Sequence, residues 1–233
     1  MTDQTAQVPF HVGDSIRDYF LQRKIGAGAY GAIFQAQFRR DQISKTIAIK
    51  LEENHPDYLL QEIEVFVLKQ ISGAKHFAKF YQCGLVNGYT FISMELLGPS
   101  VISVVNRKRP YMFSLLEMLK FTIQAIESIQ SLHHIGIVHR DIKPDNFVIG
   151  NTQETAGMIY LIDFGLCKQL PIVDGKVIKP TKPGNFRGTA RYASPNSHNL
   201  LELGRQDDLI SLLYMLVEYY TGSLPWINCS DPV

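Results

Sequence analysis

The sequence lacks the features that mark secreted, metal-stabilised or membrane-spanning chains. Its three cysteines, Cys83, Cys167 and Cys229, are widely scattered and form no C-x-x-C pair, which argues against a disulfide framework and a zinc knuckle. The first ten residues lack the basic and apolar regions of a signal peptide. The longest apolar run, residues 209–217, is well short of the ~20 residues that a bilayer crossing needs. We therefore expect no membrane partner, and a cytoplasmic or nuclear location.

The sequence also lacks an excess of either basic or acidic residues. The chain has 23 basic and 22 acidic residues, a net charge of +1, which disfavours a protein that mainly coats nucleic acid. We expect no nucleic-acid partner. Of the 233 residues, 45% are hydrophobic, enough to bury a core in one large domain or two modest ones. The oligomeric state is left open.

The hydrophobic pattern changes along the chain and predicts an α+β fold. Residues 19–53 alternate between apolar and polar side chains, which is typical of a three-stranded antiparallel meander. After Gly98 helical spacing dominates, notably at residues 114–134 and 208–220. The second of these helices is apolar nearly all round, which predicts burial at the centre of a domain. The join lies near residues 95–98, and a crevice between the two parts is the expected ligand site.

A glycine-rich segment lies between the first two predicted strands. Gly26, Gly28 and Gly31 match G-x-G-x-x-G, a pattern that dinucleotide-binding folds share. Such a fold requires a helix after the last glycine, as well as an acid about 20 residues on, where Glu52 and Glu53 stand. The residues after Gly31 alternate like a strand instead. This favours a strand–loop–strand lid over phosphates, with a plain glycine hairpin as the other alternative.

The third predicted strand presents a lysine beside a small residue. Because side chains alternate along a strand, Ala48 and Lys50 face the same side. They can offer a flat surface to a base and an ammonium group to phosphate oxygens. A lysine in this position needs a carboxylate partner, and the next helix offers Glu62 and Glu64.

Two further motifs make phosphoryl transfer the leading interpretation. Residues 139–146 read HRDIKPDN and residues 163–165 read DFG, in the order found in protein kinases. Asp141 can accept the proton of a hydroxyl group, and Lys143 can reach the transferred phosphoryl group. Asn146 and Asp163 are oxygen ligands suited to Mg²⁺ on ATP. For the adenine we expect apolar contacts from Ile25, Ile33, Ala48, Met94, Val148 and Ile162.

With these motifs the chain resembles the casein kinase 1 group, including its tau-tubulin kinase branch. The resemblance is carried by MELLGPS, HRDIKPDNF, GTARYAS and RQDDLISLLYMLVE with GSLPW. It implies a bilobal kinase domain over residues 19–233, with lobes at 19–97 and 98–233, after an extension over residues 1–18. It also implies Glu64 as the partner of Lys50, and Glu95 and Leu97 in the adenine-binding hinge behind Met94. Asp208 would brace the catalytic loop, although a helix N-cap role is the other interpretation.

The resemblance extends to the substrate. The family favours protein substrates that are acidic or already phosphorylated, and Arg191 and the backbone at Gly222 match part of its anion pocket. Residues 166–191 also carry six basic side chains against one acidic, a net of +5, although a solvated loop explains such a run equally well. The basic residues are Lys168, Lys176, Lys179, Lys182, Arg187 and Arg191.

Two departures from the family pattern leave an alternative open. Pro195 replaces the usual isoleucine and stiffens its turn. The sequence stops at Val233, where the family has further helices and one more lysine of the anion pocket, so we expect a truncated catalytic domain with apolar helix faces exposed. The leading hypothesis is an ATP- and Mg²⁺-dependent serine/threonine kinase. The alternative is a non-catalytic, kinase-like binding protein.

Overall fold

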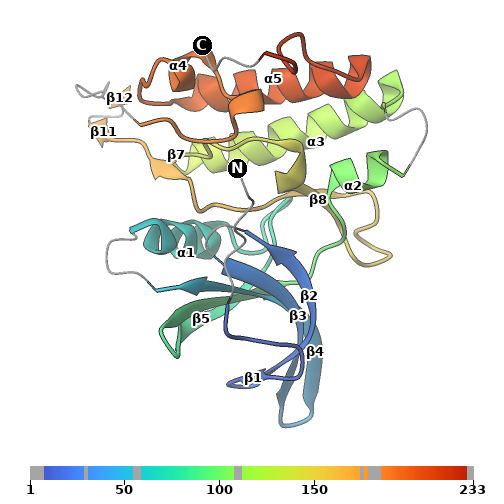
Figure 1. Cartoon of the computed structure of the whole chain (residues 1–233), viewed down its shortest axis with the longest axis vertical. Coiled ribbons are helices and arrows are strands. Elements are labelled where there is room, and N and C mark those ends of the chain that lie inside the picture. Colours follow the sequence, from blue (N-terminus) through green and yellow to red (C-terminus); the bar gives the residue numbers. More distant parts are fainter. Residues whose placement is uncertain are drawn as a thin grey trace. The chain divides into compact units, whose positions relative to one another are not determined.

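The computed structural model describes residues 8–28, 31–54, 59–107, 112–173, 176–177 and 185–229. The chain forms two compact units, of which the first comprises residues 1–74 and 78–97 and the second comprises residues 75–77 and 98–233. Strands dominate the first unit and helices the second (Figure 1). The predicted α+β class is confirmed.

The first unit is built on one antiparallel sheet whose strand order is β1-β2-β3-β4-β6-β5. The meander predicted over residues 19–53 is confirmed as β2, β3 and β4, and helix α1 follows β4 in the chain. The elements of this unit are β1 (Ser15–Ile16), β2 (Tyr19–Ala27), β3 (Gly31–Arg40), β4 (Ile43–Glu53), α1 (Leu59–Ile71), β5 (Phe80–Val86) and β6 (Tyr89–Glu95).

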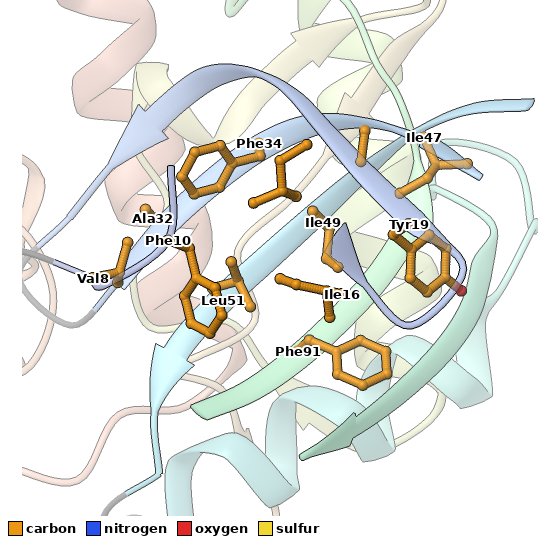
Figure 2. Close-up of a cluster of buried hydrophobic side chains, with 12 residues drawn as sticks. Val8, Phe10, Ile16, Tyr19, Ala32, Phe34, Ile47, Ile49, Leu51 and Phe91 are labelled. Carbon is orange, nitrogen blue, oxygen red and sulfur yellow. The ribbon is translucent and has the colours of Figure 1, made fainter. Parts of the chain in front are cut away.

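One face of this sheet forms a hydrophobic core with the N-terminal segment. The side chains of Ile47, Ile49 and Leu51 in β4 are at most 1% exposed, and they gather with Phe10 and Ile16 (Figure 2). Each large apolar side chain buried in this way contributes about 1.5–3 kcal/mol relative to exposure. Val8, Phe10 and Ile16 of the segment before β2 are therefore part of the first unit's core. Because side chains alternate along β4, its polar positions face the other side of the sheet.

Helices form most of the second unit. The strands in it are short, and β8 pairs with β9 while β7 pairs with β10. Among the described residues, no helix has both the length and the apolarity needed to cross a bilayer. Its elements are α2 (Val101–Val105), α3 (Leu115–His134), β7 (Ile137–Val138), a 3₁₀ helix (Pro144–Asn146), β8 (Phe147–Ile149), β9 (Ile159–Leu161), β10 (Lys168–Gln169), β11 (Ile172–Val173), β12 (Lys176–Val177), a second 3₁₀ helix (Ala190–Tyr192), α4 (Pro195–His198) and α5 (Arg205–Thr221).

Helices α3 and α5 pack against each other along their length (Figure 1). Helix α3 begins with the predicted capping box, in which Ser114 and Glu117 bond each other's backbone N–H groups. The ring of Tyr219 in α5 packs against both Phe113 and Phe121, with centroid distances of 4.7 Å and 5.8 Å, and these two rings also contact each other at 6.0 Å. This contact anchors α5 to the start of α3.

The prediction that helix 208–220 is buried all round is wrong. Leu212 and Met215 of α5 are buried, but Leu209 and Leu213 are 46% and 56% exposed. The exposed residues recur every fourth position and form a stripe on the side of α5 that faces solvent. The exposed stripe agrees instead with the expectation of exposed apolar helix faces. In the described part of the chain, α5 packs mainly against α3 and the second 3₁₀ helix.

The proline that departs from the family pattern has a simple structural role. Pro195 is the first residue of α4, where a missing N–H costs no hydrogen bond within the helix. Ser194 caps the same helix through the N–H of Ser197. The turn is thus stiffened, as expected, without loss of a backbone bond.

Candidate active site

The glycine-rich segment is a hairpin between β2 and β3. The N–H of Gly28 donates to the carbonyl oxygen of Gly31 at 3.0 Å, and Gly26 lies opposite Ile33 in the ladder. Strand β3 begins directly at Gly31, so the helix that a dinucleotide site requires is not there. The strand–loop–strand arrangement is confirmed and the dinucleotide alternative is wrong. The choice between a lid over phosphates and a plain glycine hairpin stays a prediction.

Three strands place the predicted nucleotide-binding side chains of the first unit in neighbouring positions. Ala48 of β4 lies opposite Met94 of β6, and Lys50 lies opposite Ile33 of β3. Cross-strand partners stand side by side on one face of a sheet. Ala48 is buried, whereas Ile25 is 40% exposed. The sheet therefore offers a small apolar surface next to an ammonium group.

Lys50 is held by carboxylates. Its Nζ lies 2.9 Å and 2.8 Å from the two carboxyl oxygens of Glu64, which is buried in α1. Glu62, the other glutamate that the sequence offered, is exposed. Lys50 also has a second carboxylate partner, which the sequence did not predict. Glu52 Oε1 lies 2.8 Å from Lys50 Nζ. The period-two spacing of Lys50 and Glu52 places both on one face of the sheet, but it does not by itself reveal this contact.

The predicted hinge begins where β6 ends. The backbone N–H of Glu95 donates to the carbonyl oxygen of Lys79, and its carboxylate accepts the N–H of Lys79 at 3.1 Å. These two bonds fix the last residue of β6. Leu97, two residues on, is partly buried.

In the second unit, Asp141 is the centre of a polar cluster. Its carboxylate accepts hydrogen bonds from Lys143 Nζ at 2.6 Å and from Thr189 Oγ1 at 2.8 Å. The side-chain amide of Asn146 donates to the Asp141 carbonyl oxygen at 2.8 Å. Asp141 is only 6% exposed. Donors on both carboxyl oxygens fix the orientation of this group.

Asn146 and Asp163 lie at the open ends of the β8–β9 hairpin. The N–H of Ile162 donates to the carbonyl oxygen of Asn146 at 3.0 Å, and Val148 pairs with Tyr160 two residues along the hairpin. Asp163 follows Ile162 directly, with a left-handed φ of 66°. This hairpin brings the backbone of the two predicted metal ligands, Asn146 and Asp163, close together in space.

The donor chemistry of these residues suits Mg²⁺. The amide nitrogen of Asn146 is used by Asp141, so its amide oxygen is the atom that can face a cation. Within the described ranges, no group of three or more His, Cys, Asp or Glu side chains could hold a metal alone. Mg²⁺ is typically bound by one or two protein groups together with phosphate oxygens. One carboxylate and one amide oxygen fit that pattern.

Asp208 braces the loop that carries Asp141. It is 1% exposed and accepts the N–H groups of His139 and Arg140, both at 2.8 Å, as well as Nε2–H of His133 at 2.7 Å. The N-cap alternative for Asp208 is wrong. Asp207 fills the capping role instead, because its carboxylate accepts the N–H that precedes the helix at 2.7 Å.

The basic segment is partly neutralised by acids outside it. Lys168 Nζ lies 2.6 Å from Glu202, which also contacts Arg140 at 3.5 Å. Burial lowers the pKa of the Arg140 guanidinium from its ordinary value, and the nearby Glu202 opposes that shift. Lys179 and Lys182 lie outside the described residues. The local charge is therefore smaller than the sequence count indicates.

The two residues of the predicted anion pocket meet at one glutamate. Arg191 Nη1 lies 3.4 Å from the Glu218 carboxylate, and the N–H of Gly222 donates to the Glu218 carbonyl oxygen at 2.8 Å. The hydroxyl of Tyr192 also donates to the Glu218 carboxylate, and burial raises the pKa of that phenol. Arg191 keeps 48% of its side chain exposed.

Sequence reasoning missed two side chains that contact Asp141 and Asp208. Thr189 contacts Asp141 across 48 residues of chain, and His133 contacts Asp208 across 75. Long-range contacts of this kind leave no local spacing signal. Thr189 does lie within GTARYAS, the segment that marked the family resemblance.

Comparison with known proteins agrees with this geometry. A family model described as a protein kinase domain matches residues 19–232. A probable serine/threonine-protein kinase of Dictyostelium discoideum is 39% identical over 225 residues, which are 96% of this chain and 45% of that protein. The chain thus spans about half the length of this curated relative. The matched range contains every residue assigned above to the site.

Proposed function

The chain belongs to the protein kinase family, and from this premise we propose that it is a serine/threonine kinase. It transfers the γ-phosphoryl group of ATP to hydroxyl groups of protein substrates. The observation that carries the proposal is the Asp141 carboxylate, oriented by Lys143 and Thr189 at 2.6 Å and 2.8 Å. A protein that only binds partners has no physical need of this arrangement.

The two units supply different parts of the chemistry. The first unit provides the glycine hairpin and Lys50, whose ammonium group suits the α- and β-phosphates. The second unit provides Asn146 and Asp163 for Mg²⁺, which neutralises charge on the phosphates when it is bound. Ala48 and the hinge residues of the first unit supply an apolar surface that suits the adenine ring.

Asp141 accepts the proton of the substrate hydroxyl as transfer proceeds. The hydroxyl oxygen forms the new bond to the γ-phosphorus, and the bond from that phosphorus to the bridging oxygen of ADP breaks. The electron pair of the broken bond leaves with ADP. Lys143 is placed to stabilise the negative charge of the transferred group, because its Nζ lies beside the Asp141 carboxylate.

The finer assignment is the casein kinase 1 group, with the tau-tubulin kinase branch within it. For this group we propose substrates that are acidic or already phosphorylated, in the cytoplasm or nucleus. Arg191 supports this preference because 48% of its side chain is exposed and it lies 3.4 Å from the Glu218 carboxylate. The N–H of Gly222 donates to the Glu218 carbonyl oxygen at the end of α5, so the proposal depends on Arg191. A substrate phosphate would compete with Glu218 for Arg191.

The test is transfer of labelled γ-phosphate from ATP to an acidic protein by the 233-residue chain in Mg²⁺ buffer. We expect the Asp141→Asn variant to be about 10²–10⁴-fold slower, which is the range for loss of a general base. Asp41→Asn is the matched control, because Asp41 is an exposed turn residue with a φ of 54° that asparagine tolerates. Equal rates for wild type and Asp141→Asn would refute the proposal and favour a non-catalytic binding protein.

A further inference from the structure

The ammonium group of Lys50 contacts two carboxylates. Glu64 approaches it with both oxygens, at 2.9 Å and 2.8 Å, and Glu52 Oε1 approaches it at 2.8 Å. A lysine ammonium group has three N–H donors. These three oxygens are therefore enough to use all of them.

The strand geometry explains why Glu52 reaches the lysine. Glu52 lies two positions after Lys50 in β4, on the same face of the sheet. Its partner across the ladder is Gly31, the last glycine of the hairpin. A Cβ on Gly31 would lie 2.8 Å from Glu52 Cγ and 2.0 Å from the Leu51 carbonyl oxygen. The Glu52 side chain thus lies against the base of the glycine hairpin.

The two glutamates differ in how firmly they are held. The Glu64 side chain is 3% exposed and approaches the lysine with both oxygens, so separating it from Lys50 would leave a buried charge unpaired. The Glu52 side chain is 17% exposed and makes a single contact with the lysine. Its rotation toward solvent is the cheaper change.

We propose that Glu52 is a displaceable partner of Lys50, which occupies the place of a nucleotide phosphate oxygen and leaves when a nucleotide binds. This inference rests on the proposed function, because it assigns a phosphate to the same lysine. Glu52 then weakens nucleotide binding in two ways: it must be removed from Lys50, and its charge repels the phosphates. It does not change the binding of a nucleoside that has no phosphate.

The experiment compares the binding of ADP and adenosine by calorimetry, using wild type, Glu52→Gln and Glu53→Gln. Glu53→Gln is the matched control, because it removes the same charge one residue along β4, from a side chain that alternation directs to the other face. We expect Glu52→Gln to bind ADP about two- to fivefold more tightly than wild type, within the range for a partly exposed ion pair. Adenosine affinity stays within about twofold.

A glutamine can still accept one hydrogen bond from Lys50, so Glu52→Ala serves as a second variant with no acceptor at all. It should tighten ADP binding at least as much as Glu52→Gln. A merely structural role would weaken ADP and adenosine together. Unchanged or weaker ADP binding in both Glu52 variants would overturn the inference and leave the proposed function intact. Failure of the folded wild type to bind any adenine nucleotide would instead refute the proposed function, and the inference with it.

Discussion

Asp208→Asn is the substitution whose cost can be worked out most directly from the structure. Asp208 Oδ1 accepts the N–H of Arg140, and Oδ2 accepts the N–H of His139 and Nε2–H of His133. An asparagine has only one side-chain oxygen. The least unfavourable orientation places the asparagine NH₂ group where Oδ1 was, beside the N–H of Arg140. One hydrogen bond is then lost, and the NH₂ group and the Arg140 N–H, both donors, face each other.

The size of the effect follows from this geometry. A hydrogen bond to a charged group is worth about 1.5–3 kcal/mol, and stranding a buried N–H costs about 1–3 kcal/mol. Since Asp208 is only 1% exposed, water cannot replace the lost partner. We expect a loss of about 3 kcal/mol in the free energy of unfolding, which is roughly 6–12 °C in melting temperature for a chain of this size.

The assay is thermal unfolding followed by circular dichroism, together with the rate of phosphoryl transfer. Because Asp208 fixes the two backbone amides that precede Asp141, kcat should fall more than the affinity for ATP changes. Asp41→Asn, an exposed position, should melt like wild type. A melting temperature within about 2 °C of wild type and an unchanged kcat would refute the positioning role of Asp208.

Two further predictions concern groups outside the catalytic loop. Among the described residues the buried Tyr219 hydroxyl has no hydrogen-bond partner, so Tyr219→Phe should leave the melting temperature unchanged or raise it; a fall of more than about 3 °C would contradict this. Hydrogen bonds from Lys75 and His76 hold the pKa of Glu127 below its ordinary value of 4.5. The stabilising effect of the ionised Glu127 is therefore present above pH 4.5 and lost as pH falls below it. Wild type and Glu127→Gln should differ in urea midpoint at pH 7 and converge in acid, and a pH-independent difference would count against this.

Much of the first unit could be predicted because its information is local. The alternation over β2, β3 and β4 revealed the meander, and the strand after Gly31 excluded a dinucleotide site. Glu52 shows where such reasoning stopped short. Its spacing from Lys50 was visible, but its contact depends on how far the side chain reaches, which strand alternation does not reveal.

Less of the second unit could be predicted from the sequence, because its contacts join distant parts of the chain. The motif at residues 139–146 identified Asp141, yet not the contact from Thr189. Composition predicted that α5 is buried on every side, but Leu209 and Leu213 are exposed. Which side of an apolar helix is covered depends on its neighbours in space. The domain limits and the roles of the individual site residues stay predictions.

The central claim is that this chain moves a phosphoryl group from ATP to serine or threonine. The most direct measurement incubates the chain with ATP, Mg²⁺ and an acidic protein, and quantifies ADP and phosphorylated residues by mass spectrometry. The account predicts one phosphoserine or phosphothreonine for each ADP formed, and neither product above background with Asp141→Asn. ADP without phosphoprotein, or phosphate found on tyrosine alone, would contradict it.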